Sequence, residues 1–135
     1  MLPRLGDFSP GMERFYIGTR NEDGTILAVD LDEDQNPVGE PWVFAQTPGW
    51  FHDMLVVDAC GNLYVTVFHG AEVYRITPEG EVMVLATLPP DDHVHGGAWG
   101  EGVGSWDDRT LYVTHPYLEN RVSAWELGIP RRSLE

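Results

Sequence analysis

Histidine and aspartate side chains that could do chemistry gather at a few points along the 135-residue chain. They are His52 and Asp53, His69, the stretch Asp91-Asp92-His93-Val94-His95, and His115. Imidazole takes up and releases protons near neutral pH, and a carboxylate can bind a hard cation such as Ca²⁺. These residue types allow two kinds of chemistry, proton transfer at a histidine and cation binding at Asp53, if the fold brings them together.

His93 and His95 form a second candidate metal site. They are two positions apart, so on an extended strand both rings would project from one face. Asp91 or Asp92 could then complete a ligand set for a transition metal such as zinc. Two histidines do not define a site by themselves, so polar loop residues before a buried strand remain the alternative.

The segments that must position these residues recur with a fixed period. Tyr16, Tyr64 and Tyr112 stand in similar apolar segments and are 48 positions apart, since 64 − 16 and 112 − 64 are both 48. A second repeated segment follows each tyrosine, with equivalent positions at Ile26, Val73 and Val122. The segments are rich in β-branched and aromatic residues and are separated by Gly, Pro, Asn and Asp, which predicts strands.

Four strands in about 48 residues are typical of one blade of a β-propeller. A β-sandwich also uses short strands, but it has no reason to repeat at a fixed period. At this period 135 residues give about 2.8 blades, in the approximate ranges 1–47, 48–90 and 91–135. The sequence therefore predicts an all-β fold, a partial six-bladed propeller whose last blade lacks its fourth strand.

Strand order within a blade decides which loops share a rim. If strands A to D run from the axis outward, the D-to-A and B-to-C connections lie at one rim and the other turns lie opposite. All five histidines fall at the first rim, called the histidine rim below, with Trp50 and Phe51 beside them. We therefore expect the site at the histidine rim.

The opposite rim carries Asp58, Asp107 and Asp108 in turns rich in Gly, Asn and Asp. These residue types favour tight turns, so a structural role is expected for the three aspartates. Cys60 lies in one of these turns without a basic neighbour to activate its thiol, which argues against a nucleophile. As the single cysteine it cannot form an internal disulfide.

Composition narrows the range of partners. The chain has 22 acidic and 8 basic residues, a net charge of −14, and it has no basic stripe, so neither nucleic acid nor an anionic membrane is expected to be a partner. No apolar run approaches the ~18 residues of a membrane span, and residues 1–10 lack the features of a signal peptide. The compartment stays unknown.

Three segments resemble the six-bladed propellers of the senescence marker protein, gluconolactonase and luciferin-regenerating enzyme family. Residues 52–65, His-Asp-Met-Leu-Val-Val-Asp-Ala-Cys-Gly-Asn-Leu-Tyr-Val, are similar to the family's Pro-Asp-Gly-Met-x-Val-Asp-x-x-Gly-Asn-Leu-Tyr-Val. Residues 8–17 look like its Phe-Ser-Pro-Asp-Gly-Lys-x-Leu-Tyr stretch, and residues 100–114 resemble its Phe-Gly-Gly followed by Thr-Leu-Tyr-Val-Thr. The segment 52–65 is the most specific, although simpler NHL-type propellers share its core.

The resemblance implies Ca²⁺ or another divalent metal at the central opening, held by a Glu, one or two Asn and an Asp that aligns with Asp53. The family's Asn-Gly aligns with Arg4-Leu5, its Gly after the Asp has become Met54, and the Asn before its last inner strand aligns with Gly96. The Glu has no counterpart in this chain. Affinity for Ca²⁺ follows the number of oxygen ligands, so weak binding by this chain alone is expected.

The leading functional hypothesis is the C-terminal half of a metal-dependent, lactonase-like hydrolase. It would act on a small lactone or ester, with His115 or His95 as the base. The alternatives are a non-catalytic propeller that binds a ligand through Trp50 and Phe51, and an enzyme resembling strictosidine synthase that works without metal. An unclosed propeller exposes blade faces and strand edges, which predicts either missing N-terminal blades of a longer protein or a homodimer of half-propellers.

Overall fold

All regular structure in the computed structural model is β-sheet. The structure describes residues 3–49, 51–68, 70–116 and 120–131, which contain eleven strands in three antiparallel sheets. Within these ranges there is no helix, and hence no helix long and apolar enough to cross a membrane. The predicted all-β fold of consecutive antiparallel blades, two with four strands and the last with three, is confirmed.

Each sheet is one blade, and its strands pair in chain order. Blade 1 consists of β1 (Pro3–Phe8), β2 (Arg14–Thr19), β3 (Thr25–Leu31) and β4 (Pro37–Gln46). Blade 2 consists of β5 (His52–Val57), β6 (Leu63–Val67), β7 (Glu72–Ile76) and β8 (Val82–Thr87). Blade 3 has three strands, β9 (Gly96–Trp99), β10 (Thr110–His115) and β11 (Arg121–Glu126).

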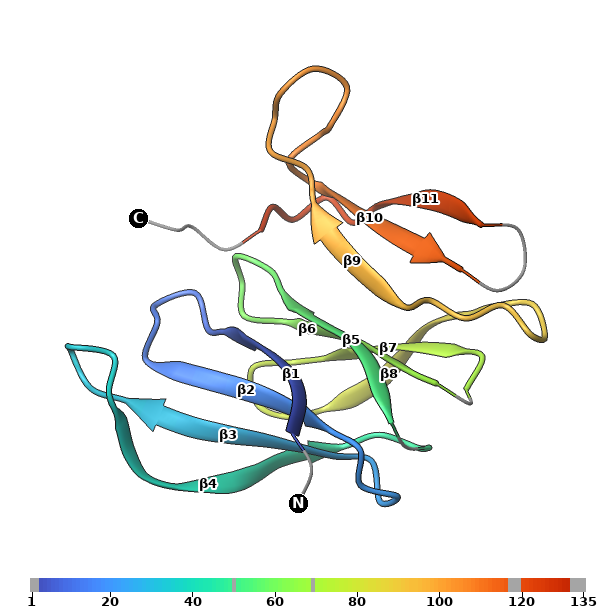
Figure 1. Ribbon diagram of the computed structural model, residues 1–135. Coiled ribbons are helices and arrows are strands. Elements are labelled where there is room, and N and C mark those ends of the chain that lie inside the picture. Colours follow the sequence, from blue (N-terminus) through green and yellow to red (C-terminus); the bar gives the residue numbers. More distant parts are fainter. Residues whose placement is uncertain (1–2, 50, 69, 117–119, 132–135) are drawn as a thin grey trace.

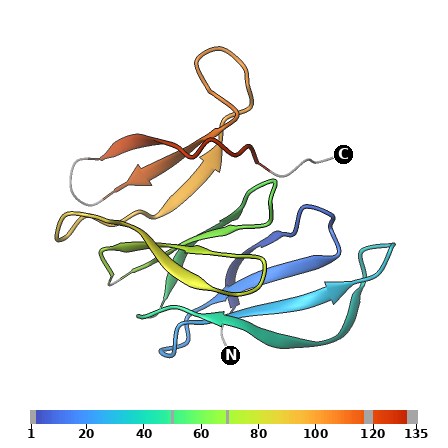
Figure 2. The same ribbon diagram turned by 180° about the vertical axis from the view of Figure 1, so that it is seen from behind.

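The three blades stack face to face, with blade 2 between the other two (Figures 1 and 2). The first strands β1, β5 and β9 contact one another from blade to blade, whereas β4 and β8 are largely exposed. The first strand of each blade is therefore the inner strand, as the propeller prediction requires. The same topology places the loops before β5 and β9 and the loops after β2, β6 and β10 at the histidine rim.

Two hydrophobic cores hold the stack together. The first joins blade 1 to blade 2 and includes Tyr16, Ile26, Leu55 and Val65. The second joins blade 2 to blade 3 and includes Met54, Tyr64, Val94, Leu111 and Val113. Burial of apolar side chains on both faces of blade 2 supplies most of the driving force for stacking.

The repeat tyrosines occupy equivalent positions in the second strands. Tyr16 pairs with Ala28, Tyr64 with Arg75 and Tyr112 with Ala124. Tyr16 packs against blade 2 and Tyr64 packs against blade 3. The neighbours of Tyr112 in the strand, Leu111 and Val113, face blade 2, so alternation points Tyr112 to the other face of blade 3.

After β11 the described chain does not continue along the outer edge of blade 3. Residues 127–131 instead cross the opposite rim to blade 2, where the Ala59 N–H donates to the Pro130 carbonyl at 2.8 Å. Asp58 forms an isolated β-bridge with Arg131. Among the described strands, none pairs with the outer edge of β11, which matches the predicted lack of a fourth strand in blade 3.

Candidate functional site

Asp53 lies in a β-bulge at the start of an inner strand. His52 pairs with Val67 but Met54 pairs with Thr66, so Asp53 is the extra residue in β5. A bulge turns the side chain of its extra residue away from the regular alternation, and bulges are frequent beside functional sites. The Asp53 side chain is fully buried, and its Oδ2 lies 3.6 Å from Nε2 of His95.

Asp53 and His95 occupy equivalent positions in neighbouring blades. Met54 pairs with Thr66 and Gly96 pairs with Thr114, and each of these threonines is two residues after the repeat tyrosine. The residues just before them, Asp53 and His95, therefore stand at the same place in blades 2 and 3. In blade 1 the corresponding position is Arg4, at a bulge of its own in β1. Positions 4, 53 and 95 are thus equivalent positions at the inner strands of blades 1, 2 and 3.

His52 is a structural histidine despite its place at the histidine rim. It is fully buried, its Nδ1 accepts the backbone N–H of Thr19 at 3.0 Å, and its Nε2 lies 2.9 Å from Oγ1 of Thr47. Because Nδ1 is an acceptor, the ring proton is on Nε2 and points to Thr47. Burial lowers the pKa of His52 to about 4, so the ring is neutral at pH 7.

His115 belongs to a second buried network at the same rim. Its Nδ1 lies 2.8 Å from Oδ1 of Asp92, and the other oxygen of Asp92 accepts a 2.8 Å hydrogen bond from Arg121. Burial alone would raise the pKa of Asp92, but hydrogen bonds from His115 and Arg121 outweigh burial and lower it. Within the described part of the chain, Nε2 of His115 is buried without a hydrogen-bond partner.

This network uses a residue that the sequence had offered as a metal ligand. Asp92 pairs with His115 and Arg121 rather than completing a site with His93 and His95. His93 stacks on the ring of Phe68, with 5.7 Å between centroids. Sequence reasoning missed the network, although it placed Tyr112 and Val122 in consecutive strands, and the pairing of β10 with β11 brings His115 opposite Arg121.

A row of rings crosses the histidine rim beside these groups. The Phe68 ring lies 5.5 Å from the ring of Phe51, and the Arg20 guanidinium lies 4.8 Å above Phe51. With His93 this forms a continuous series from blade 1 to the loop before β9. His69 and Trp50, which the sequence also placed at this rim, lie outside the described residues.

The described residues do not complete a metal centre. Among them no three His, Cys, Asp or Glu side chains are arranged to hold one ion. Asp53 supplies one carboxylate and His95 one imidazole, whereas Ca²⁺ takes six to eight oxygen ligands. Asp53 is the residue that the family resemblance offers as a ligand, and its role as a metal ligand stays a prediction.

On the opposite rim, Asp58 is structural, as its place in a turn predicted. It is fully buried, and its carboxylate accepts hydrogen bonds from the backbone of Cys60, from Asn62 and from the Tyr64 hydroxyl. Asp107 accepts the N–H of Arg109 in the same manner. Cys60 is an exposed free thiol.

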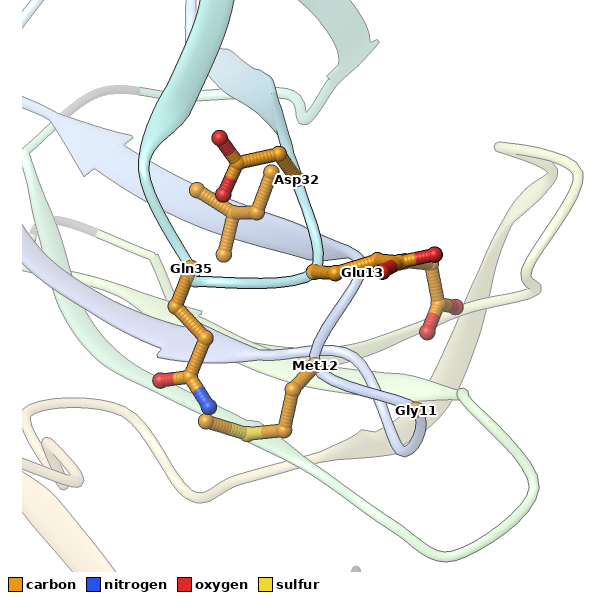
Figure 3. Close-up of a pocket in the computed structure, with 7 residues that line it drawn as sticks. Gly11, Met12, Glu13, Asp32 and Gln35 are labelled. Atoms are coloured by element: carbon orange, nitrogen blue, oxygen red, sulfur yellow. The ribbon is translucent and has the colours of Figure 1, made fainter.

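The same rim contains an acidic hollow of about 250 Å³ in blade 1 (Figure 3). It lies between the β1–β2 and β3–β4 turns and is lined by Glu13, Asp32 and Glu33 among others. Asp32 accepts the N–H groups of Asp34 and Asn36, so its carboxylate holds the turn. The hollow is therefore explained by turn chemistry.

The fold and these two rims define a segment of a β-propeller, and comparison with known proteins assigns its family. Residues 6–116 match the SMP-30/Gluconolactonase/LRE-like region, which is most of the chain. The chain belongs to the SMP-30/gluconolactonase/LRE-like family. No curated protein sequence matches it.

Solved structures of that family have the same fold at low identity. Luciferin-regenerating enzyme is 19% identical with a TM-score of 0.72, covering 96% of this chain and 47% of that one. Regucalcin from Agrobacterium tumefaciens, described as a calcium-binding protein, is 22% identical with a TM-score of 0.68, covering 98% and 47%. A third structure, assigned as a gluconolactonase, is 22% identical with a TM-score of 0.69, covering 95% and 39%. The chain spans less than half the length of each of these proteins.

Proposed function

We propose that this chain is the C-terminal half of a lactonase-like hydrolase that opens small lactones or esters at the histidine rim. The observation that supports this most is the pair formed by Asp53 and His95, with 3.6 Å between Oδ2 and Nε2. The pair stands at the inner strands of adjacent blades, and Asp53 is the residue that aligns with an acidic metal ligand of the family. Membership of the family agrees with this chemistry.

His95 is the better placed of the two candidate bases. Its side chain is 36% exposed, so a water molecule and a substrate can reach it. His115 is only 1% exposed and is held by Asp92, so it could serve as a base only if the rim opened. We assign the base to His95 and regard His115 as the second candidate.

The proposed reaction needs one proton carrier. Nε2 of His95 takes a proton from water as the water oxygen forms a bond to the lactone carbonyl carbon. The ring C–O bond then breaks, and the leaving oxygen receives that proton from the imidazolium, giving the hydroxy acid. Asp53, beside Nε2, stabilises the imidazolium in between.

A divalent metal, Ca²⁺ by family resemblance, would have to find most of its ligands elsewhere. Asp53 is the one residue here that we expect to contribute, since the described residues hold no group of three ligands. No step of the proton transfer above depends on the ion. Metal dependence is therefore a separate question in the experiment.

The test is the initial rate of ring opening, followed by pH-stat titration against a panel of sugar and aliphatic lactones, with CaCl₂, ZnCl₂ or EDTA. We expect Asp53→Asn and His95→Gln each to lower kcat by about 100-fold or more. His93→Gln, a matched change at the same rim, should stay within about twofold. Rates equal to the spontaneous reaction on every lactone would contradict the proposal, and activity unaffected by EDTA would favour the metal-free alternative.

A binding function is the second candidate, and the row of Arg20, Phe51, Phe68 and His93 favours it. Aromatic faces bind apolar or cationic ligands by stacking. In that case ligand binding should weaken about tenfold in Phe68→Ala while Asp53→Asn leaves it unchanged. The opposite pattern favours the hydrolase.

A further inference from the structure

The outer face of blade 3 is exposed at positions that are buried in the other two blades. Ile26, Val73 and Val122 pair with Gly18, Thr66 and Thr114, which are equivalent positions. Ile26 and Val73 are 0% exposed, whereas Val122 is 60% exposed. The side chain of Val122 lies on the same face as Tyr112, where blades 1 and 2 each meet the following blade.

The outer face of blade 1 is the complementary surface. Its Phe15 and Ile17 correspond, at the 48-residue spacing, to Leu63 and Val65 of blade 2. Leu63 and Val65 are completely buried where blade 2 receives Tyr16. Phe15 and Ile17 are only partly buried, and they present the same kind of apolar surface on a face that no described blade covers.

The open face of blade 3 and the open face of blade 1 are therefore complementary in the same way as the two surfaces that meet at each contact between neighbouring blades. We call the side of a blade that carries its repeat tyrosine the tyrosine face, and the opposite side the receiving face. The tyrosine face of blade 1 packs on the receiving face of blade 2, which carries Leu63 and Val65, and blade 2 packs on blade 3 in the same way. Blade 3 offers another tyrosine face, and blade 1 offers another receiving face. Repeats that bury such faces need a neighbour on each side.

We propose that the occupant of both faces is a second copy of this chain, which stands where the other half of the longer relatives would stand. The Tyr112 face of one copy docks on the Phe15 and Ile17 face of the other, and the reverse contact closes a ring with two-fold symmetry. The chain spans 47% of the length of two propeller relatives, so two copies supply about one full ring. Two identical contacts related by a two-fold axis form a closed assembly.

This assembly would complete the site, and that part rests on the proposed function. In one copy Asp53 and His95 are neighbours at the inner strands. A ring with two-fold symmetry places a second such pair at the same central opening. The two Asp53 carboxylates could then share one divalent ion such as Zn²⁺, while each His95 keeps its Nε2 for the proposed proton transfer.

Sedimentation velocity of the full chain from 1 to 200 μM tests the docking independently of activity. The chain has a mass of 15.1 kDa, and we expect a species of twice that mass. Val122→Lys should weaken association by at least about 30-fold, because it places a charge in the contact. Val84→Lys is the matched control, since Val84 is 57% exposed on the outermost strand of blade 2, and it should dimerise normally. Circular dichroism of both variants checks that the fold is kept.

Three outcomes would overturn the docking. A monomer at 200 μM would assign the open faces to blades of a longer protein. A dimer whose association is not weakened by Val122→Lys would place the contact elsewhere, such as the edge of β11. A larger oligomer that Val122→Lys does not weaken would lead to the same conclusion. If the dimer forms, titration with ZnCl₂ should show one ion per two chains, lost in Asp53→Asn. One ion per chain, or none, would overturn the shared centre even if lactone hydrolysis is observed.

Discussion

Nδ1 of His52 accepts the backbone N–H of Thr19 at 3.0 Å, and this contact ties the inner strand of blade 2 to the second strand of blade 1. The other ring nitrogen lies 2.9 Å from the hydroxyl of Thr47, at the end of blade 1. A residue that looked like part of a reactive histidine cluster thus joins two blades. Its neighbour Asp53, one position on, is the residue that reaches the next blade.

The burial of His52 predicts a pH-dependent stability. Burial holds the pKa of His52 at about 4 in the folded chain, whereas an unfolded histidine has a pKa of about 6.5. Between these values the unfolded chain binds more protons, so the free energy of unfolding falls as pH falls through this window. The loss between pH 7.5 and 5.0 should be about 2 kcal/mol.

Urea unfolding at the two pH values measures this loss. His52→Gln should largely remove the difference, although it also lowers stability at pH 7.5. His93→Gln removes a histidine from the same rim and should leave the difference in place. Equal unfolding free energies at both pH values in the unmutated chain would show that His52 does not carry the effect.

Gly97 should be intolerant of a side chain. A Cβ at Gly97 would lie 2.8 Å from Sδ of Met54 and 3.2 Å from Cγ1 of Val113, inside the core between blades 2 and 3. Overpacking of this kind costs about 1–3 kcal/mol, which thermal unfolding of Gly97→Ala would detect. At the adjacent Gly96 the nearest atom is 3.8 Å away, so Gly96→Ala should change stability by less than about 1 kcal/mol. Equal effects at both positions would contradict this packing.

Removal of the Asp58 carboxylate should be among the most damaging single changes. Asp58→Ala leaves several buried donors without an acceptor, including the hydroxyl of Tyr64. We expect a loss of about 3–4 kcal/mol in the free energy of unfolding. Asp32 holds the corresponding kind of turn at an exposed place in blade 1, so Asp32→Ala should cost less than about 1 kcal/mol. A small effect at Asp58 would mean that water replaces its hydrogen bonds.

The contact between Thr66 and the Val94 carbonyl should stabilise the junction of blades 2 and 3. Oγ1 of Thr66 is buried and donates to this carbonyl at 3.0 Å. Thr66→Val keeps the shape but leaves the carbonyl unsatisfied, at a cost of about 1–2 kcal/mol. Thr114 makes a similar 3.3 Å contact to Gly96 that is exposed in the single chain, and Thr114→Val should be neutral within about 0.5 kcal/mol when unfolding is measured on the monomer. Comparable losses in the two variants would argue against a special role for the buried contact.

The 48-residue repeat was sufficient to predict the blades, because alternation along a strand and recurrence along the chain are one-dimensional patterns. Tyr16, Tyr64 and Tyr112 could be assigned to equivalent strands from their spacing alone. The histidine rim followed from strand order, and the turn role of Asp58 followed from residue type. Each of these inferences needs only neighbours within one blade.

The site depended on contacts between blades, which no local pattern contains. Asp53 and His95 are 42 positions apart (95 − 53), and they meet because a bulge turns Asp53 and the next blade brings the loop before β9 beside it. Asp92 bonds to His115 rather than joining His93, although the sequence allowed the second arrangement. Whether a histidine is buried and neutral, as His52 is, or accessible, as His95 is, depends on the packing of separate sheets. Only the tertiary structure determines this, because the stacking of the blades fixes the distances between side chains of neighbouring blades and decides which of those side chains water can reach.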